Sequence, residues 1–133
     1  MSPKMNIYLA SPYKSLEIVE ARAEQLRALG HIVTSRWHTR PKVDYDPTQT
    51  PKDWEAEADA DLIDIARANM LVLCLEVPSL KGHGGKDFEA GYAYAAGIWV
   101  VTVGPRQNVF HFLEDITNYP SWDQFLEERT NGR

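Results

Sequence analysis

The sequence lacks the features that mark secreted, membrane-spanning and nucleic-acid-binding proteins. Its one cysteine, Cys74, cannot form a disulfide within the chain, and a reducing compartment is the simplest inference. No apolar run approaches the roughly 20 residues of a membrane span, and residues 1–6 have no signal-like apolar core. A net charge of -5 argues against a general nucleic-acid binder. We therefore expect a cytoplasmic protein whose partners include neither a membrane nor a nucleic-acid polymer.

Signatures of bound metals and cofactors are missing as well. The four histidines are scattered without the spacing of metal ligands. The first predicted strand is followed by neither a glycine-rich dinucleotide turn nor a Walker-type phosphate loop, and no serine-nucleophile elbow occurs. We expect no metal and no cofactor.

The remaining composition, 44% hydrophobic and 25% charged over 133 residues, indicates one domain, residues 1–133, with a core of its own. Local patterns predict strands that alternate with helices. The predicted strands are 5–10, 31–35, 69–76 and 98–103, with a weaker one near Ile116. The predicted helices are 16–29, 51 to about 68, and 87–96, with a last helix that begins near Ser121. Residues 36–49 form a long polar loop in this prediction.

Such alternation predicts an α/β fold, a doubly wound sheet of mostly parallel strands with helices on both faces and right-handed crossovers. Ligands of such folds bind at the carboxyl ends of the strands. Three segments with polar or glycine-rich sequences reach that edge: 11–15, 76–89 and 104–108.

Asp61 falls within the apolar stripe of its predicted helix. At about 100° per residue, this stripe contains Trp54, Ala58, Leu62 and Ile65. A carboxylate on an inward face needs partners or solvent, so it indicates either a functional group or a structural ion pair, with about equal weight. Glu55 and Asp59 lie on the other side of the helix, where we expect solvent.

Glu89 lies in the first turn of the predicted helix 87–96. Exposed backbone donors and the helix dipole favour an ionised carboxylate there, and an ionised glutamate can be a nucleophile. An ordinary acid at a helix start is the more common explanation for one such residue. Gly84 and Gly85 favour the functional interpretation because they let a ligand approach the backbone. The small residues Ala90, Gly91 and Ala93 allow close packing.

Together, Asp61 and Glu89 suit cleavage at an anomeric carbon, where one carboxylate attacks C1' and the other manages a proton or hydrogen bond on the leaving group. The loop that contains Ser11 and Lys14 is a candidate for holding a phosphate or sugar oxygen, although serine and lysine are also ordinary helix-start residues.

The aromatic residues divide into core and site candidates. Tyr8 is predicted to be core. Tyr13 is placed either to touch the nucleophile or a base, or simply to pack in a loop. A cluster in the long loop could cover a base or form a mobile surface segment: Arg36, Trp37, His38 and Arg40.

Four segments of the chain resemble the nucleoside 2-deoxyribosyltransferase-like family, which includes the 2'-deoxynucleoside 5'-phosphate N-hydrolases. They are residues 7–13 (IYLASPY), 61–69 (DLIDIARAN), 84–93 (GGKDFEAGYA) with Gly97, and 103–111 (VGPRQNVFH). The last segment is similar to a small phage and bacterial subgroup. The resemblance implies a flavodoxin-like fold of about five mostly parallel strands.

The resemblance also implies roles for individual residues. Glu89 becomes the nucleophile that forms a glycosyl-enzyme intermediate, Asp61 a catalytic or sugar-binding aspartate, and Tyr13 an aromatic near the nucleophile. Ser79 is similar to a phosphate-contacting serine of the monophosphate hydrolases. Many transferases of the family hold the base with an acid that precedes a glycine turn. At this place the chain has not an acid but His83, followed by Gly84 and Gly85, which makes these residues the candidates for contact with the substrate. Sites shared between subunits imply a homodimer or larger homo-oligomer, with Asn108 as a contributor.

We therefore expect an enzyme that acts on a small-molecule nucleoside or nucleotide. The expected reaction is cleavage or transfer at the N-glycosidic bond of a 2'-deoxynucleoside or its 5'-monophosphate, through a covalent intermediate on Glu89. The alternative is a nucleotide-binding module of the same fold without catalysis. A flavodoxin-like electron carrier ranks lower because no flavin phosphate loop is visible.

Overall fold

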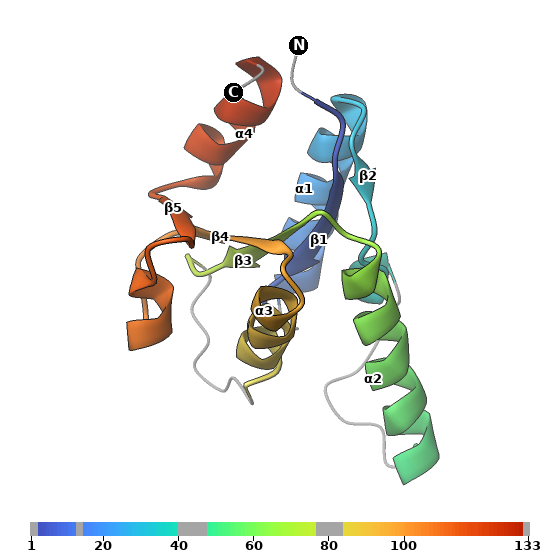
Figure 1. Cartoon of the computed structure of the whole chain (residues 1–133). Helices are drawn as coiled ribbons and strands as arrows, with labels where there is room; N and C mark the ends of the chain where they lie inside the picture. Colours follow the sequence, from blue (N-terminus) through green and yellow to red (C-terminus); the bar gives the residue numbers. More distant parts are fainter. Residues whose placement is uncertain (1–2, 13–14, 40–47, 77–83, 132–133) are drawn as a thin grey trace.

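The computed structural model describes residues 3–12, 15–39, 48–76 and 84–131 (Figure 1). Five parallel strands form one sheet in the order β2-β1-β3-β4-β5. The strands are β1 (Asn6–Ala10), β2 (Ile32–Val33), β3 (Met70–Cys74), β4 (Trp99–Val103) and β5 (Thr117–Tyr119). The strand order reverses between β1 and β3, which is the place where ligands bind in open α/β sheets. The predicted α/β architecture is therefore confirmed.

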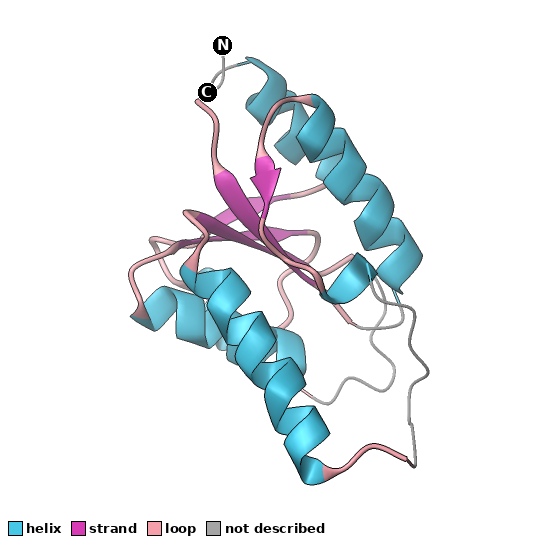
Figure 2. Ribbon diagram, turned by 90° about the vertical axis from the view of Figure 1, so that its right-hand side faces the viewer, coloured by secondary structure: helices cyan, strands magenta, loops and turns pink. Residues whose placement is uncertain are grey.

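Helices cover both faces of the sheet (Figure 2). They are α1 (Leu16–Ala28), α2 (Pro51–Ala66), α3 (Gly85–Ala95) and α4 (Trp122–Asn131), with short 3-10 helices η2 (Trp37–Thr39) and η3 (Val109–Phe112). α1 and α4 share one face, where Nε1 of Trp122 donates to Oε1 of Gln25 over 2.8 Å. α2 and α3 lie on the other face (Figure 1). In the described part of the chain, no helix has the length and apolar character needed to cross a membrane.

The central strands are apolar along their whole length because helices cover them on both sides. All five residues of β3 are buried, as are the last four of β1. Tyr8 pairs with Leu71 in the register of these two strands. On α1, the inward stripe consists of Val19, Ala23 and Leu26. These strands therefore form the rigid base of the sheet edge where the candidate site lies.

Both predicted helix starts that depend on capping are confirmed. Thr50 and Asp53 form a reciprocal capping box with Pro51 in the first turn of α2. Ser121 accepts a hydrogen bond from the backbone N–H of Gln124 over 3.2 Å, so α4 begins directly after it. Local hydrogen bonds of this kind depend on neighbouring residues alone, which is why the sequence predicts them well.

The predicted inward stripe of α2 is correct only for its C-terminal half. Leu62 and Ile65 are partly or fully buried, but Trp54 is 42% exposed and Ala58 is exposed. The reason is length, since α2 extends well beyond the sheet in Figure 1 and its first turns have no sheet beneath them. Glu55 and Asp59 are exposed, as predicted.

Two aromatic residues of the predicted long loop belong to the core. Trp37 and His38 are 6% and 1% exposed, and Nε1 of Trp37 donates to the carbonyl oxygen of Leu9 over 2.8 Å. Nε2 of His38 lies 2.8 Å from the Ser35 hydroxyl, and its Nδ1 lies 2.5 Å from a carboxylate oxygen of Glu20. Both expectations for this pair, a cover over a base or a mobile surface, are therefore wrong. Arg40 lies outside the described residues.

Candidate active site

Tyr8 and Glu89 meet at the switch point of the sheet. Tyr8 is fully buried in β1, and its hydroxyl group donates a hydrogen bond to Oε2 of Glu89 on α3. The prediction that Tyr8 is a core residue is confirmed by its burial, but it did not include the hydrogen bond from the hydroxyl group to Glu89. A buried tyrosine hydroxyl needs a hydrogen-bond partner, and that rule is the signal that could have identified Tyr8 as part of the site.

Glu89 is not in the first turn of its helix. Gly84, with a φ of 84°, is the residue before α3, and the helix begins at Gly85. Asp87 is therefore the first-turn acid, and Glu89 follows it by two residues, in the second turn. The predicted start at residue 87 was too late because the helix includes Gly85, a residue type that disfavours helices.

Burial, rather than the helix dipole, dominates the ionisation of Glu89. The pKa of the Glu89 carboxyl group is raised to about 7: desolvation raises it most, the hydrogen bond from Tyr8 lowers it, and the negative charge of Asp61 raises it. A helix dipole contributes about 0.3–1 kcal/mol, less than one pKa unit, whereas burial can shift a carboxyl group by several units. The expectation that a helix start favours the ionised form of Glu89 is therefore wrong, because Glu89 lies beyond the first turn and its burial favours the neutral form.

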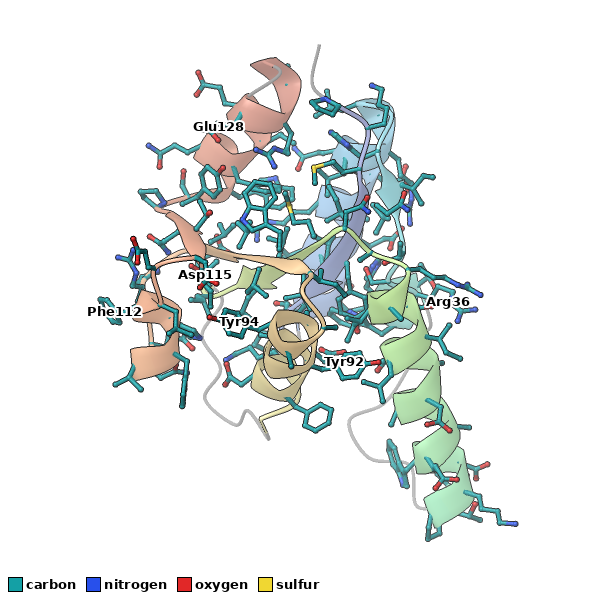
Figure 3. The ribbon with its side chains drawn as sticks, in the orientation of Figure 1. Arg36, Tyr92, Tyr94, Phe112, Asp115 and Glu128 are labelled. Carbon is teal, nitrogen blue, oxygen red and sulfur yellow. The ribbon has the colours of Figure 1, made fainter. Side chains whose placement is uncertain are left out.

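Asp61 lies near this pair, as predicted. It is partly buried on α2, and its charge raises the pKa of both Tyr8 and Glu89. α2 and α3 lie side by side on one face of the sheet, and Tyr92 points from α3 toward α2 in Figure 3. The structure therefore brings the two predicted carboxylates together with a tyrosine hydroxyl group at one sheet edge.

A second carboxylate on α2, Asp64, is 1% exposed and forms an ion pair that the sequence analysis missed. Nε of Arg36 lies 3.0 and 3.1 Å from the two oxygens of Asp64, and Nη2 lies 2.9 Å from Oδ1. The hydrogen bond and the charge of Asp64 raise the pKa of Arg36, to which Asp61 also contributes. Asp64 lies one helical turn after Asp61, a spacing that could have drawn attention to it.

The other predicted binding residues have different surroundings. The Ser11 hydroxyl lies 2.6 Å from that of Ser15, whose oxygen lies 2.6 Å from the carbonyl oxygen of Pro12, so the loop bonds within itself. Among the described residues, no atom lies within 4 Å of a Cβ atom added to Gly84 or Gly85. Four predicted site residues lie outside the described residues: Tyr13, Lys14, Ser79 and His83.

Asn108 has a local structural role. Its side-chain oxygen accepts a hydrogen bond from the backbone N–H of Phe110 over 3.0 Å at the start of η3. The neighbouring Gln107 connects this loop to the rest of the edge, since its Nε2 donates to the carbonyl oxygen of Leu75 over 2.9 Å and its Oε1 lies 3.3 Å from Nζ of Lys86. The loop after β4 and the start of α3 are thus joined, as their common position at the sheet edge predicts.

Comparison with solved structures identifies the fold. A 2-deoxyribosyltransferase from the psychrotolerant bacterium Bacillus psychrosaccharolyticus superposes with a TM-score of 0.71 at 24% identity, over 91% of this chain and 90% of the other. The chain has the fold of a 2-deoxyribosyltransferase. A conserved protein from Enterococcus faecalis V583 gives a TM-score of 0.67 at 20% identity, over 97% and 99% of the two chains. No family model and no curated protein sequence matches the chain.

The transferase-like fold places the Tyr8–Glu89 pair at the edge where ligands bind in doubly wound sheets. Within the described residues, no group of three or more histidine, cysteine, aspartate and glutamate side chains is arranged to hold a metal ion. The described residues of the site offer the carboxyl groups of Glu89, Asp61 and Asp64, the phenol of Tyr8 and the guanidinium group of Arg36.

Proposed function

We propose that the chain cleaves the N-glycosidic bond of a 2'-deoxynucleoside or its 5'-monophosphate, and transfers the sugar to a base or to water. One observation carries the proposal: the carboxyl group of Glu89 is held by the Tyr8 hydroxyl, near Asp61, at the ligand-binding edge of this fold. The fold of the Bacillus enzyme and the sequence resemblance support the same chemistry.

The first step forms a bond between a Glu89 carboxylate oxygen and C1' of the sugar. The C1'–N bond breaks at the same centre, and its electron pair leaves with the base, which takes up a proton. Tyr8 donates its hydrogen bond to Oε2 of Glu89, so Oε1 is the oxygen available for attack. We assign to Asp61 the proton transfer or the hydrogen bond on the leaving base.

The second step releases Glu89. A ring nitrogen of a second base, or water, attacks C1' and breaks the bond to the glutamate oxygen, which regains its negative charge. A pKa of about 7 suits this cycle, since the carboxylate is basic enough to attack and is still partly ionised at neutral pH.

We further propose that the chain acts as a homodimer or larger homo-oligomer. The short helix η3 exposes large apolar side chains, with Val109 at 76%, Phe110 at 69% and Phe112 at 66% exposure, and Phe112 is visible at the molecular surface in Figure 3. Apolar surface of this kind marks interaction sites. Asn108 immediately precedes η3. If η3 contacts a neighbouring subunit, Asn108 lies at that interface, and we propose that it contributes to the neighbour's site.

A direct assay tests the proposed function. The protein is incubated with deoxynucleosides and their 5'-monophosphates, with and without a second base, and free and exchanged bases are followed by chromatography. Glu89→Gln should abolish turnover, whereas the matched control Glu55→Gln, an exposed glutamate of α2, should retain it. Recovery of every substrate unchanged with tight binding would instead support the non-catalytic nucleotide-binding module.

A further inference from the structure

Arg36 is a cation fixed at the rim of the candidate active site. It follows β2 and lies beside the C-terminal half of α2 in Figure 3, where Asp64 holds it. Its side chain is 57% exposed, although the carboxylate that anchors it is 1% exposed. Asp64 follows Asp61 by about one helical turn on α2, so the ion pair of Arg36 adjoins the aspartate whose charge acts on Glu89.

The exposed edge of the Arg36 guanidinium group retains donors for a ligand. A guanidinium group has five N–H donors in a planar fork. Contacts with Asp64 use the Nε–H and one Nη2–H, which leaves three N–H groups on the exposed side of the described ion pair. Anchoring through a buried carboxylate fixes the plane of the fork before any ligand arrives, which reduces the entropic cost of binding.

The chemistry of the ion pair favours a neutral acceptor over a phosphate. Asp64 already balances the charge of Arg36, so the pair as a whole offers a phosphate dianion little net attraction. Its directional N–H donors remain suited to carbonyl oxygens and ring nitrogens. The fork of an arginine matches the O6 and N7 atoms of a 6-oxopurine, whereas adenine has an amino donor in place of the O6 acceptor.

The sequence between β3 and α3 is consistent with binding a base through its hydrogen-bond acceptors. No aspartate or glutamate occurs between Glu76 and Asp87, the segment that connects β3 to α3. An acid in that segment would accept hydrogen bonds from amino groups of a base. Without such an acid, this segment has no carboxylate to accept those hydrogen bonds, and the guanidinium group of Arg36 can only donate them.

We propose that Arg36, held by Asp64, binds O6 and N7 of a 6-oxopurine, so that the chain prefers 2'-deoxyguanosine and 2'-deoxyinosine type substrates over adenine substrates. The inference rests on the proposed N-glycosidic cleavage and deepens it. When the C1'–N9 bond breaks, its electron pair moves into the purine ring, and the Arg36 donors stabilise the negative charge that spreads to N7 and O6. The departing base then takes up a proton from water.

Two measurements on the wild-type protein and on Glu89→Gln test this proposal separately from turnover. The wild-type kcat/KM is compared for 2'-deoxyguanosine, 2'-deoxyinosine and 2'-deoxyadenosine. A good bidentate contact discriminates by roughly 5- to 150-fold, and we expect the 6-oxopurines to be favoured by a factor in this range. The dissociation constants of 2'-deoxyguanosine, 7-deaza-2'-deoxyguanosine and 2'-deoxyadenosine are measured on Glu89→Gln, where cleavage is blocked, and the first ligand should bind most tightly.

Variants distinguish recognition of the base from a merely structural ion pair. Arg36→Lys keeps the charge beside Asp64 but lacks the planar fork. The double variant Arg36→Met/Asp64→Asn removes the pair without leaving a buried, unpaired carboxylate, which protects folding. Both should lose the preference for 6-oxopurines in kcat/KM and in binding to Glu89→Gln. The matched control Arg67→Met, an exposed arginine just after α2, should keep it.

The outcomes separate this inference from the proposed function. Cleavage with equal or better rates for adenine substrates, or a preference that survives in both Arg36 variants, overturns the inference and leaves the proposed function standing. An equal loss of kcat/KM for all three substrates in those variants also overturns the inference, since an ion pair with a merely structural role predicts that pattern. If nothing is cleaved, an Arg36-dependent preference in binding supports recognition, whereas equal binding of all ligands overturns it.

Discussion

The hydroxyl group of Tyr8, a buried residue of β1, donates a hydrogen bond to the carboxylate of Glu89, although 81 positions separate the two residues in the chain. This contact joins a buried strand to the proposed nucleophile. It fixes one carboxylate oxygen and leaves the other for attack, and it lowers the pKa of Glu89 against the larger effect of burial. The geometry and the ionisation of Glu89 therefore depend on the same hydroxyl group.

Replacing Tyr8 by phenylalanine should shift the pH dependence of the reaction to higher pH. Attack requires ionised Glu89, so kcat/KM should rise with pH through about 7 in the wild-type protein. Tyr8→Phe removes the hydrogen bond that lowers this pKa, and the rising limb should move above 7 with a lower rate at neutral pH. A pH–rate profile measures both effects, and a limb that stays in place would show that another group controls it.

Replacing Asp61 by asparagine should move the same limb in the opposite direction. The negative charge of Asp61 raises the pKa of Glu89, so its removal lets Glu89 ionise at lower pH. The plateau rate should nevertheless fall by roughly 100- to 10,000-fold because general acid–base assistance to the leaving base is lost. Opposite limb shifts in Asp61→Asn and Tyr8→Phe are the expected signature, and shifts of the same sign would contradict the assigned roles.

Glu89 should destabilise the folded protein at alkaline pH. Its pKa is raised from 4.5 to about 7, so between these values the folded state binds more protons than the unfolded state, and stability falls as pH rises. At roughly 1.4 kcal/mol per unit, the full effect is on the order of 3 kcal/mol.

Glu89→Gln isolates this effect because glutamine stays neutral at all pH values. Chemical denaturation should show that Glu89→Gln is more stable than the wild-type protein at pH 8, and that the difference shrinks as pH falls through 7 toward 4.5. A difference that is independent of pH would argue against a raised pKa in the folded state.

Trp37 should contribute to stability rather than to base recognition. Trp37→Phe leaves the buried carbonyl oxygen of Leu9 without its 2.8 Å donor, at a cost of about 1–3 kcal/mol in the free energy of unfolding. Denaturant titration measures this loss. Relative kcat/KM values among deoxynucleosides with different bases should stay unchanged, and a selective loss of one base would restore the interpretation of this residue as a cover over the ligand.

Two glycines near the site should respond to alanine in opposite ways. Gly104 has a φ of 106°, and a Cβ atom there would lie 2.7 Å from the backbone nitrogen of Glu76. Gly104→Ala should therefore cost on the order of 2 kcal/mol or more. Gly91 lies inside α3 with nothing within 4 Å of an added Cβ, so Gly91→Ala should stabilise by about 0.5–1 kcal/mol. Thermal unfolding of the two variants provides the comparison.

Much of the fold could be predicted because its signals are local. The buried strands read as continuous apolar runs, the helix starts at Thr50 and Ser121 depend on residues three positions apart, and Gly30 ends α1 with a φ of 92°. The predictions failed where length or neighbours mattered, as in the exposed first turns of α2 and the buried Trp37. The local sequence of these residues does not show whether other elements pack against them.

The sequence alone made Glu89 and Asp61 candidates, since acids beside glycines or within an apolar stripe are visible in one dimension, and the family resemblance then implied their roles. It could not indicate that Tyr8 is the hydroxyl group on Glu89 or that Arg36 is paired with Asp64, because these partners come from different elements and meet only after the chain folds. The same holds for the pKa of Glu89, which depends on how much solvent the surrounding elements exclude. Folding thus turned an acid that local sequence assigns to a helix start into a buried, hydrogen-bonded carboxyl group.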